Sequence, residues 1–200
     1  MKLYFSPGAC SLSPHIVLRE AGVPFELEQV TLSTKKTSTG ADFNAINPKG
    51  YVPALALDDG QVLTEGPAIV QYVADLRPEA KLAPSGGLPR ARLQEWLNFI
   101  STEVHKGFGP LFNPKTPDDA RQATIEKLGT RFDYVVKSLG DKPYLLGEFS
   151  VADAYLFTVL RWTTFLKVDL GKWPALKGYI ERVESRPAVK AALAAESQKK

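Results

Sequence analysis

Over residues 1–77, short apolar runs alternate with longer segments whose apolar positions recur at helical spacing. The short runs predict strands and the longer segments predict helices, because side chains repeat with periods of about 2 and about 3.6 residues in the two structures. The expected strands are 2–5, 25–32, 52–57 and 61–63, and the expected helices are 13–22 and 67–76. A strand–helix–strand unit followed by two close strands and a helix predicts an α/β sandwich.

The strand-like pattern ends near residue 78. A segment rich in Pro and Gly follows and predicts a linker. Beyond the linker every apolar pattern is helical, and we expect helices at 90–108, 117–140, 150–168, 174–185 and 187–195. The helix at 150–168 is apolar nearly all round, which is typical of a helix at the centre of a domain. The chain is therefore predicted to contain an α/β domain (1–77), a linker (78–89) and an all-helical domain (90–200).

Composition narrows the class of protein. The 200 residues are 44% hydrophobic and carry a net charge of +3, as expected of an ordinary globular protein. The basic residues are scattered and no apolar run approaches the roughly 20 residues of a membrane span, so we predict neither a nucleic-acid nor a membrane partner. The first residues contain no signal-peptide pattern, which predicts a cytoplasmic protein. A single cysteine excludes an intrachain disulfide and a cysteine-based zinc cluster, and no metal is predicted.

That cysteine, Cys10, lies where a predicted strand joins a predicted helix. Free N–H groups and the helix dipole stabilise a thiolate at a helix N-terminus, so the position predicts a lowered pKa for Cys10. Free cysteines are also often small buried hydrophobes. Position alone leaves a functional and a structural role open.

Two more stretches could bind a ligand through backbone groups. In "NPKGYVPAL", a cis bond before Pro53 would let the backbone of Val52 pair with an extended peptide-like ligand. In "LTEGPAIVQY", Glu65 and Gly66 precede Pro67 at a helix start, where N–H groups suit a carboxylate and Glu65 suits an ammonium group. Alternatively, Pro53 is simply a turn residue and Glu65 simply caps the helix.

The helical half contains two polar motifs. Asn98, Thr102 and Lys106 recur at i, i+4 and i+8, with His105 at i+7, which predicts one polar helix face. This face is either a ligand wall or a solvated surface. Ser150 and Asp153 have the spacing of a capping box and are expected to be structural.

Together these motifs resemble the cytosolic glutathione transferases of the bacterial beta class, in particular those associated with the degradation of aromatic compounds. The resemblance covers essentially the whole chain, and the segments that carry it occur in the same order: "YFSPGACSLSPHIVLREAG", "NPKGYVPAL", "DDGQVLTEGPAIVQYVAD", "EWLNFISTEVHKGF" and "SVADAYLFTVLRW". It implies a thioredoxin-like N-terminal domain, an all-α C-terminal domain and a homodimer.

The resemblance also implies roles for individual residues. Those implied to be catalytic are Cys10 and His105. Those implied to bind glutathione are Lys35, Val52, Pro53, Glu65, Gly66, Asn98, Thr102, Glu103 and Lys106, with Glu103 reaching the partner subunit's site. Those implied to wall a pocket for the electrophile are Phe108, Phe112, Tyr155 and Trp162.

The implied activity is attack of the glutathione thiol on a small, mostly apolar electrophile, with glutathione as co-substrate and no metal. Two alternatives remain. The spacing of Cys10 and Ser13 also suits a glutathione-dependent thiol–disulfide oxidoreductase or reductive dehalogenase that uses Cys10, and the same fold suits a non-catalytic ligand-binding protein. One departure from the family pattern is Gly66, where many relatives carry Ser; it predicts weaker glutathione binding.

Overall fold

The computed structural model describes residues 1–197, and its first 76 residues contain a mixed sheet. The five strands have the order β3-β2-β1-β4-β5. Central β1 (Lys2–Phe5) pairs in parallel with β2 (Glu26–Thr31) and antiparallel with β4 (Ala54–Ala56). The edges are β3 (Lys36–Thr37) and β5 (Val62–Thr64), both antiparallel to their neighbours.

Helices cover both faces of this sheet. Leu3 and Leu55 belong to the main apolar core together with α1 (Leu12–Glu20) and α3 (Gly66–Leu76). On the opposite face, Val30 and Ala54 pack against Phe43 of α2 (Phe43–Ile46). Alternate residues of a strand point to opposite faces, so these short strands are apolar on both sides.

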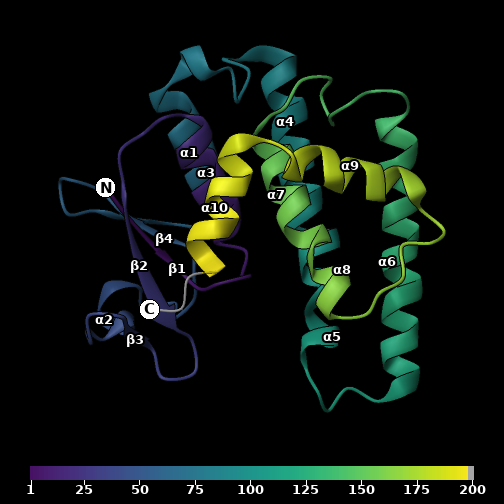
Figure 1. The fold of residues 1–200 in the computed structure, drawn as a ribbon, viewed down its shortest axis with the longest axis horizontal. Helices are drawn as coiled ribbons and strands as arrows, with labels where there is room; N and C mark the ends of the chain where they lie inside the picture. The colour runs from purple at the N-terminus through teal and green to yellow at the C-terminus, as the bar shows by residue number, and fades with distance from the viewer. Residues whose placement is uncertain (198–200) are drawn as a thin grey trace.

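The helical half packs around α7 (Val151–Leu160), in which every residue is buried. The other helices of this half are α4 (Gly87–Phe99), α5 (Gly109–Phe112), α6 (Asp118–Leu139), α8 (Trp162–Phe165) and α9 (Pro174–Glu184), of which α4, α8 and α9 pack on α7. The last helix, α10 (Pro187–Ser197), returns to the α/β half and packs on α1 (Figure 1). Because α1 contacts both α7 and α10, the two halves share one apolar core. No helix within residues 1–197 is both long and apolar enough to cross a membrane.

The predicted architecture, an α/β unit followed by helices, is confirmed over the described residues, but several element boundaries were wrong. The expected helix 90–108 starts at Gly87 and loses its α-helical geometry at Ile100, where a π-helix (Ile100–His105) and a 3₁₀ turn (Lys106–Phe108) follow. The expected helix 150–168 is interrupted at Arg161. Four short elements were missed: β3, α2, α5 and the 3₁₀ turn Pro78–Ala80. Residues 198–200 of the predicted helical domain lie outside the described part.

Candidate active site

A pocket of about 260 Å³ lies where the α/β half meets the helical half. In the α/β half, the lining residues lie just before or at the start of α1, β4 and α3. In the helical half, they belong to the π-helix, to the 3₁₀ turn that follows it and to α7. The lining residues are Cys10, Tyr51, Val52, Pro53, Glu65, Gly66, Pro67, Ser101, His105, Lys106 and Tyr155. Seven of the residues singled out from the sequence therefore meet in one cavity, together with Tyr155 of the predicted electrophile pocket.

Cys10 is half-buried in this pocket, just before α1. Its thiol donates a hydrogen bond to the carbonyl of Val52, with an Sγ–O distance of 3.4 Å. Burial raises the pKa of the Cys10 thiol to about 11, although the backbone N–H groups of Cys10 and Ser11 act in the opposite direction. The lowered pKa predicted from the helix start is therefore wrong for this structure. Because α1 begins only at Leu12, the cost of removing a thiolate from water outweighs the N–H groups, and Cys10 is a neutral thiol at pH 7.

The Val52–Pro53 peptide bond is cis, which the sequence motif had left open beside a simple turn proline. Strand β4 begins only at Ala54, because Pro53 has no N–H to donate to a neighbouring strand. Val52 therefore lies outside the sheet hydrogen bonding and lines the pocket opposite Cys10.

Glu65 is held by two residues that the sequence did not single out. Its Oε1 atom accepts hydrogen bonds from Lys49 Nζ and from the Tyr51 hydroxyl, both at 2.7 Å. These two bonds lower the pKa of Glu65, so the group is a carboxylate at neutral pH. Its backbone has φ 69° and ψ 114°, a conformation that non-glycine residues rarely adopt. Lys49 and Tyr51 thus orient a charged oxygen at the entrance of α3.

We expect Tyr51→Phe to weaken glutathione binding about fivefold, since one hydrogen bond to a charged group is lost at a partly exposed site. Isothermal titration with glutathione measures the effect. The matched control is Tyr4→Phe, on the far face of the sheet beside Phe43, which should leave binding unchanged. Equal affinities of Tyr51→Phe and wild type would show that Tyr51 does not orient Glu65.

His105 is largely buried between two aromatic side chains. Its Nδ1 atom shares a 2.6 Å hydrogen bond with the Tyr155 hydroxyl, and its ring packs edge-on against Trp162 at 4.8 Å. Burial, and secondarily the charge of Lys106, lowers the pKa of His105 to about 4. Burial also raises the pKa of Tyr155. Both groups are therefore neutral at pH 7 and act through hydrogen bonds rather than charge.

The predicted polar stripe on the helix at 90–108 divides at the π-helix. The N–H of Lys106 bonds to the carbonyl of Ser101, five residues earlier. This widened turn shifts the positions that follow, and Ser101, His105 and Lys106 line the pocket. Asn98 and Thr102 are exposed and do not line it, and the Thr102 hydroxyl instead donates to the Asn98 carbonyl at 3.0 Å. A regular α-helical spacing was the wrong assumption for this segment.

Two predicted glutathione ligands also lie outside the pocket lining. Lys35 Nζ donates to the Gly50 carbonyl at 2.6 Å. Glu103 accepts from Arg131 in the same chain, with an Nη2–Oε2 distance of 2.6 Å. Either residue would have to share or leave its present partner to contact a ligand.

Of the four aromatic residues predicted to wall an electrophile pocket, Tyr155 alone lines the Cys10 cavity. Phe108 is fully buried and packs against Trp162 at 5.7 Å. Phe112 is 47% exposed and contacts the same indole at 5.0 Å. The Trp162 indole N–H donates to the Gly8 carbonyl at 2.9 Å, which ties this aromatic group to the segment that carries Cys10.

The capping box at the start of α7 forms as predicted. Asp153 Oδ2 accepts from the Ser150 N–H at 2.9 Å and from its hydroxyl at 2.8 Å. Asp153 Oδ1 accepts from the Leu145 N–H and the Tyr179 hydroxyl, both at 2.9 Å. Both residues are buried away from the pocket, so their role is structural.

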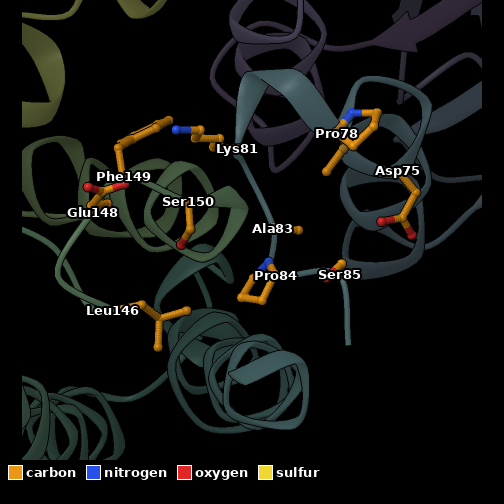
Figure 2. Close-up of a pocket in the computed structure, with 11 residues that line it drawn as sticks. Asp75, Pro78, Lys81, Ala83, Pro84, Ser85, Leu146, Glu148, Phe149 and Ser150 are labelled. Atoms are coloured by element: carbon orange, nitrogen blue, oxygen red, sulfur yellow. The ribbon is translucent and has the colours of Figure 1, made fainter. Parts of the chain in front are cut away.

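A second, larger cavity of about 690 Å³ lies between the end of α3, the segment after it and residues 146–150 (Figure 2). Figure 2 shows Asp75 and Glu148 on opposite sides, with Ala83 and Pro84 between them. Asp75 is already bound by Arg90 through two hydrogen bonds of 2.7 and 2.8 Å. Ser150 is the only predicted site residue in its lining. The cavity contains neither a thiol nor an imidazole, so the smaller pocket around Cys10 is the candidate for catalysis.

Comparison with known proteins identifies the class. The chain matches the family model of the glutathione S-transferase N-terminal domain over residues 8–76 and that of the C-terminal domain over residues 99–187. The chain belongs to the glutathione S-transferase family. The glutathione S-transferase GstA of Escherichia coli O157:H7 is 48% identical over 201 residues, covering 100% of both chains.

Solved structures agree. The ternary complex of BphK, a bacterial glutathione S-transferase, has a TM-score of 0.96 and 57% identity and covers 99% of this chain and 100% of its own. A beta-class enzyme from Sphingomonas chungbukensis has a TM-score of 0.94 and 48% identity and covers 98% and 99% of the two chains. A sphingomonad enzyme complexed with glutathione has a TM-score of 0.95 and 47% identity over the full length of both. The predicted family is confirmed.

Proposed function

We propose that this chain catalyses attack of the glutathione thiolate on small, mostly apolar electrophiles. The observation that supports the proposal most directly is the meeting of three groups in one pocket. The Cys10 thiol lies 3.4 Å from the Val52 carbonyl, and the oriented carboxylate of Glu65 lines the same cavity. In a γ-glutamyl-cysteinyl peptide, the Cys10 thiol suits the cysteinyl sulfur, the Val52 backbone suits the peptide groups, and the Glu65 carboxylate suits the γ-glutamyl ammonium group.

Glutathione would bind in an extended conformation. The Val52 backbone would pair with the cysteinyl unit, as an added strand does. The second carboxylate oxygen of Glu65 would accept the γ-glutamyl ammonium group. The start of α3 at Gly66 would receive the γ-glutamyl carboxylate, and Lys106 adds positive charge at the rim. In this proposal Lys35 meets the glycine carboxylate with N–H groups other than the one bound to Gly50.

The protein's contribution to the chemistry is to favour the glutathione thiolate. Each unit by which it lowers the pKa of the glutathione thiol contributes about 1.4 kcal/mol towards ionisation. Because Cys10 is itself a neutral thiol, its S–H can turn from the Val52 carbonyl and donate to the thiolate. His105 is neutral, and with its proton on Nδ1 it would donate to the Tyr155 hydroxyl at 2.6 Å. The Tyr155 proton would then be free for the ligand, so His105 positions a second neutral donor rather than supplying a positive charge.

The test is the steady-state rate of glutathione addition to an aromatic chloro-nitro electrophile, measured for wild type, Cys10→Ala and Cys10→Ser. Turnover by wild type supports the proposal, and the serine variant shows whether a hydroxyl donor can replace the thiol. A wild-type protein that binds glutathione without turnover would contradict it and favour a carrier.

The alternative of thiol–disulfide exchange draws support from the exposure of the Cys10 sulfur to the same pocket. Against it, a thiol with a pKa of about 11 is largely un-ionised at pH 7 and reacts slowly. Reduction of a mixed disulfide with glutathione distinguishes the two. If Cys10→Ala abolishes this reduction but retains conjugation, the protein has both activities.

Gly66→Ser is expected to tighten glutathione binding about threefold, because the new hydroxyl can donate to the γ-glutamyl carboxylate. The site has room, since a Cβ atom at Gly66 would have Pro53 Cγ as its nearest neighbour, at 4.0 Å. Gly66→Ala adds the same carbon without a donor and is the matched control. If both variants bind glutathione as wild type does, the hydroxyl has no partner there.

We propose in addition that the chain forms a homodimer and works in the cytoplasm. Trp96, Phe99 and Tyr134 form an aromatic cluster between α4 and α6, and Tyr134 is 47% exposed. Such a cluster is typical of an interface. In the proposed dimer the Glu103 carboxylate would leave Arg131 and contact the glutathione bound in the partner subunit's site. Light scattering of wild type and Tyr134→Ser measures the assembly.

The proposed cytoplasmic location draws support from the single cysteine, which suits a reducing compartment.

A further inference from the structure

A third cavity, of about 400 Å³, lies behind Trp162, between α7, α8, α9 and the segment that carries Cys10. None of the residues that line it also lines the Cys10 pocket. Trp162 separates the two regions. His105, Phe108 and Phe112 pack against the indole at 4.8–5.7 Å, whereas Ile180 and Glu184 of α9 line the cavity with it.

The walls of this cavity suit an aromatic ring. Trp162 and Ile180 contribute apolar surface, and Phe165 contributes a ring that is 55% exposed. An exposed phenylalanine next to a tryptophan forms an apolar surface for which burial is favourable. The indole N–H is already bound to the Gly8 carbonyl at 2.9 Å, so Trp162 is a fixed wall. The volume is within the range of pockets that hold small organic ligands.

Two charged groups line the cavity, Glu184 and its ion-pair partner Arg161. Its guanidinium carbon lies 5.5 Å from the Phe157 ring, and one of its nitrogens donates to Glu184 at 3.1 Å. This is its only side-chain hydrogen bond within residues 1–197, which leaves most of the five guanidinium donors for a ligand. A planar guanidinium fixed over a ring binds a carboxylate well. Both members of the ion pair are partly exposed, so a ligand can reach them from solvent.

We propose that this cavity binds a small aromatic carboxylate, with its ring against Trp162 and Phe165 and its carboxylate on Arg161. The site goes beyond the proposed transferase function. It holds no thiol, since the only cysteine of the chain lies in the other pocket. It is therefore a binding site that can be filled while glutathione occupies the Cys10 pocket.

Calorimetric titration with 1-naphthoate tests the proposal on protein saturated with S-hexylglutathione, which fills the Cys10 pocket and the apolar surface next to it. We expect one naphthoate per chain, with an affinity that S-hexylglutathione changes less than about twofold. The neutral 1-naphthamide should bind about tenfold more weakly, because it lacks the charge-assisted bond to Arg161. Displacement of naphthoate by S-hexylglutathione, or equal binding of the amide or of 1-naphthylmethylamine, would overturn the proposal.

Arg161→Met tests the same point from the side of the protein. It keeps most of the apolar stem and should weaken naphthoate about tenfold without changing the binding of naphthamide. Arg92→Met removes an exposed arginine paired with Glu95 and is the matched control. Should Arg161→Met fail to fold, Ile180→Trp serves instead, since it fills the cavity and should abolish naphthoate binding. Binding of S-hexylglutathione is measured separately, so a failure of the proposed transferase function is distinguishable from a failure of this site.

Discussion

Asp153→Ala is expected to lower the free energy of unfolding by about 4 kcal/mol, a large part of the stability of an ordinary domain. The carboxylate is fully buried and accepts from four donors, which belong to Leu145, Ser150 and Tyr179. Alanine would leave these donors buried without partners, and each such group costs about 1 kcal/mol or more. Urea denaturation followed by circular dichroism measures the loss.

The controls separate the hydrogen bonds from the negative charge. Asp153→Asn keeps one acceptor oxygen and should lose about half as much stability. Asp119→Ala removes an exposed aspartate from the first turn of α6 and should cost less than about 1 kcal/mol. If Asp153→Ala unfolds at the same urea concentration as Asp119→Ala, the buried network does not stabilise α7.

Glu196→Ala is expected to cost about 3 kcal/mol and to raise the KM for glutathione. Glu196 is buried on α10, where its Oε1 meets His15 Nδ1 at 2.9 Å and its Oε2 accepts from the Gly8 N–H at 3.2 Å. Arg19 Nε can only donate, and it lies 2.8 Å from His15 Nε2. The proton of His15 is therefore on Nδ1 and donates to Glu196, so the variant leaves this buried donor and the partly buried N–H of Gly8 without their partner.

Denaturation and glutathione kinetics of Glu196→Ala should be compared with Glu181→Ala, which removes an exposed glutamate from α9. Glu196→Gln keeps one acceptor and should lie between wild type and Glu196→Ala. A stability loss with an unchanged KM would show that α10 supports the fold without positioning the segment around Cys10.

The sequence predicted the features that depend on local pattern. Strands such as 2–5 and helices such as 174–184 follow from spacing alone. The Ser150–Asp153 cap follows from the Ser-x-x-Asp spacing, which places both side chains at the N–H groups of the first helical turn. The meeting of Cys10, Val52 and Glu65 needed the family resemblance, because these residues lie on segments that only tertiary packing brings together.

Other features could not be read from local pattern. The π-helix at Ile100–His105 has no glycine or proline to mark it, and Ser101, His105 and Lys106 line the pocket where the regular spacing had favoured Asn98 and Thr102. The pKa of Cys10 depends on burial, which the helix position does not reveal. Lys49 and Tyr51 left no local signal, because Lys49 lies in a turn and Gly50 between them has a φ of 68°. Only the folded backbone brings both to the same oxygen of Glu65.

Gly8 bears on how the protein is made. Its N–H is bound by Glu196 of the last helix and its C=O by Trp162, and its φ of 73° favours a glycine. Gly8 is synthesised 188 residues before Glu196, so the turn before Cys10 acquires both bonds only after residue 196 has been added. A nascent or truncated chain that ends before α10 has its thiol but lacks one of the two ties that hold it in place. The turn that leads into Cys10 is therefore fully tied only once α10 has been synthesised.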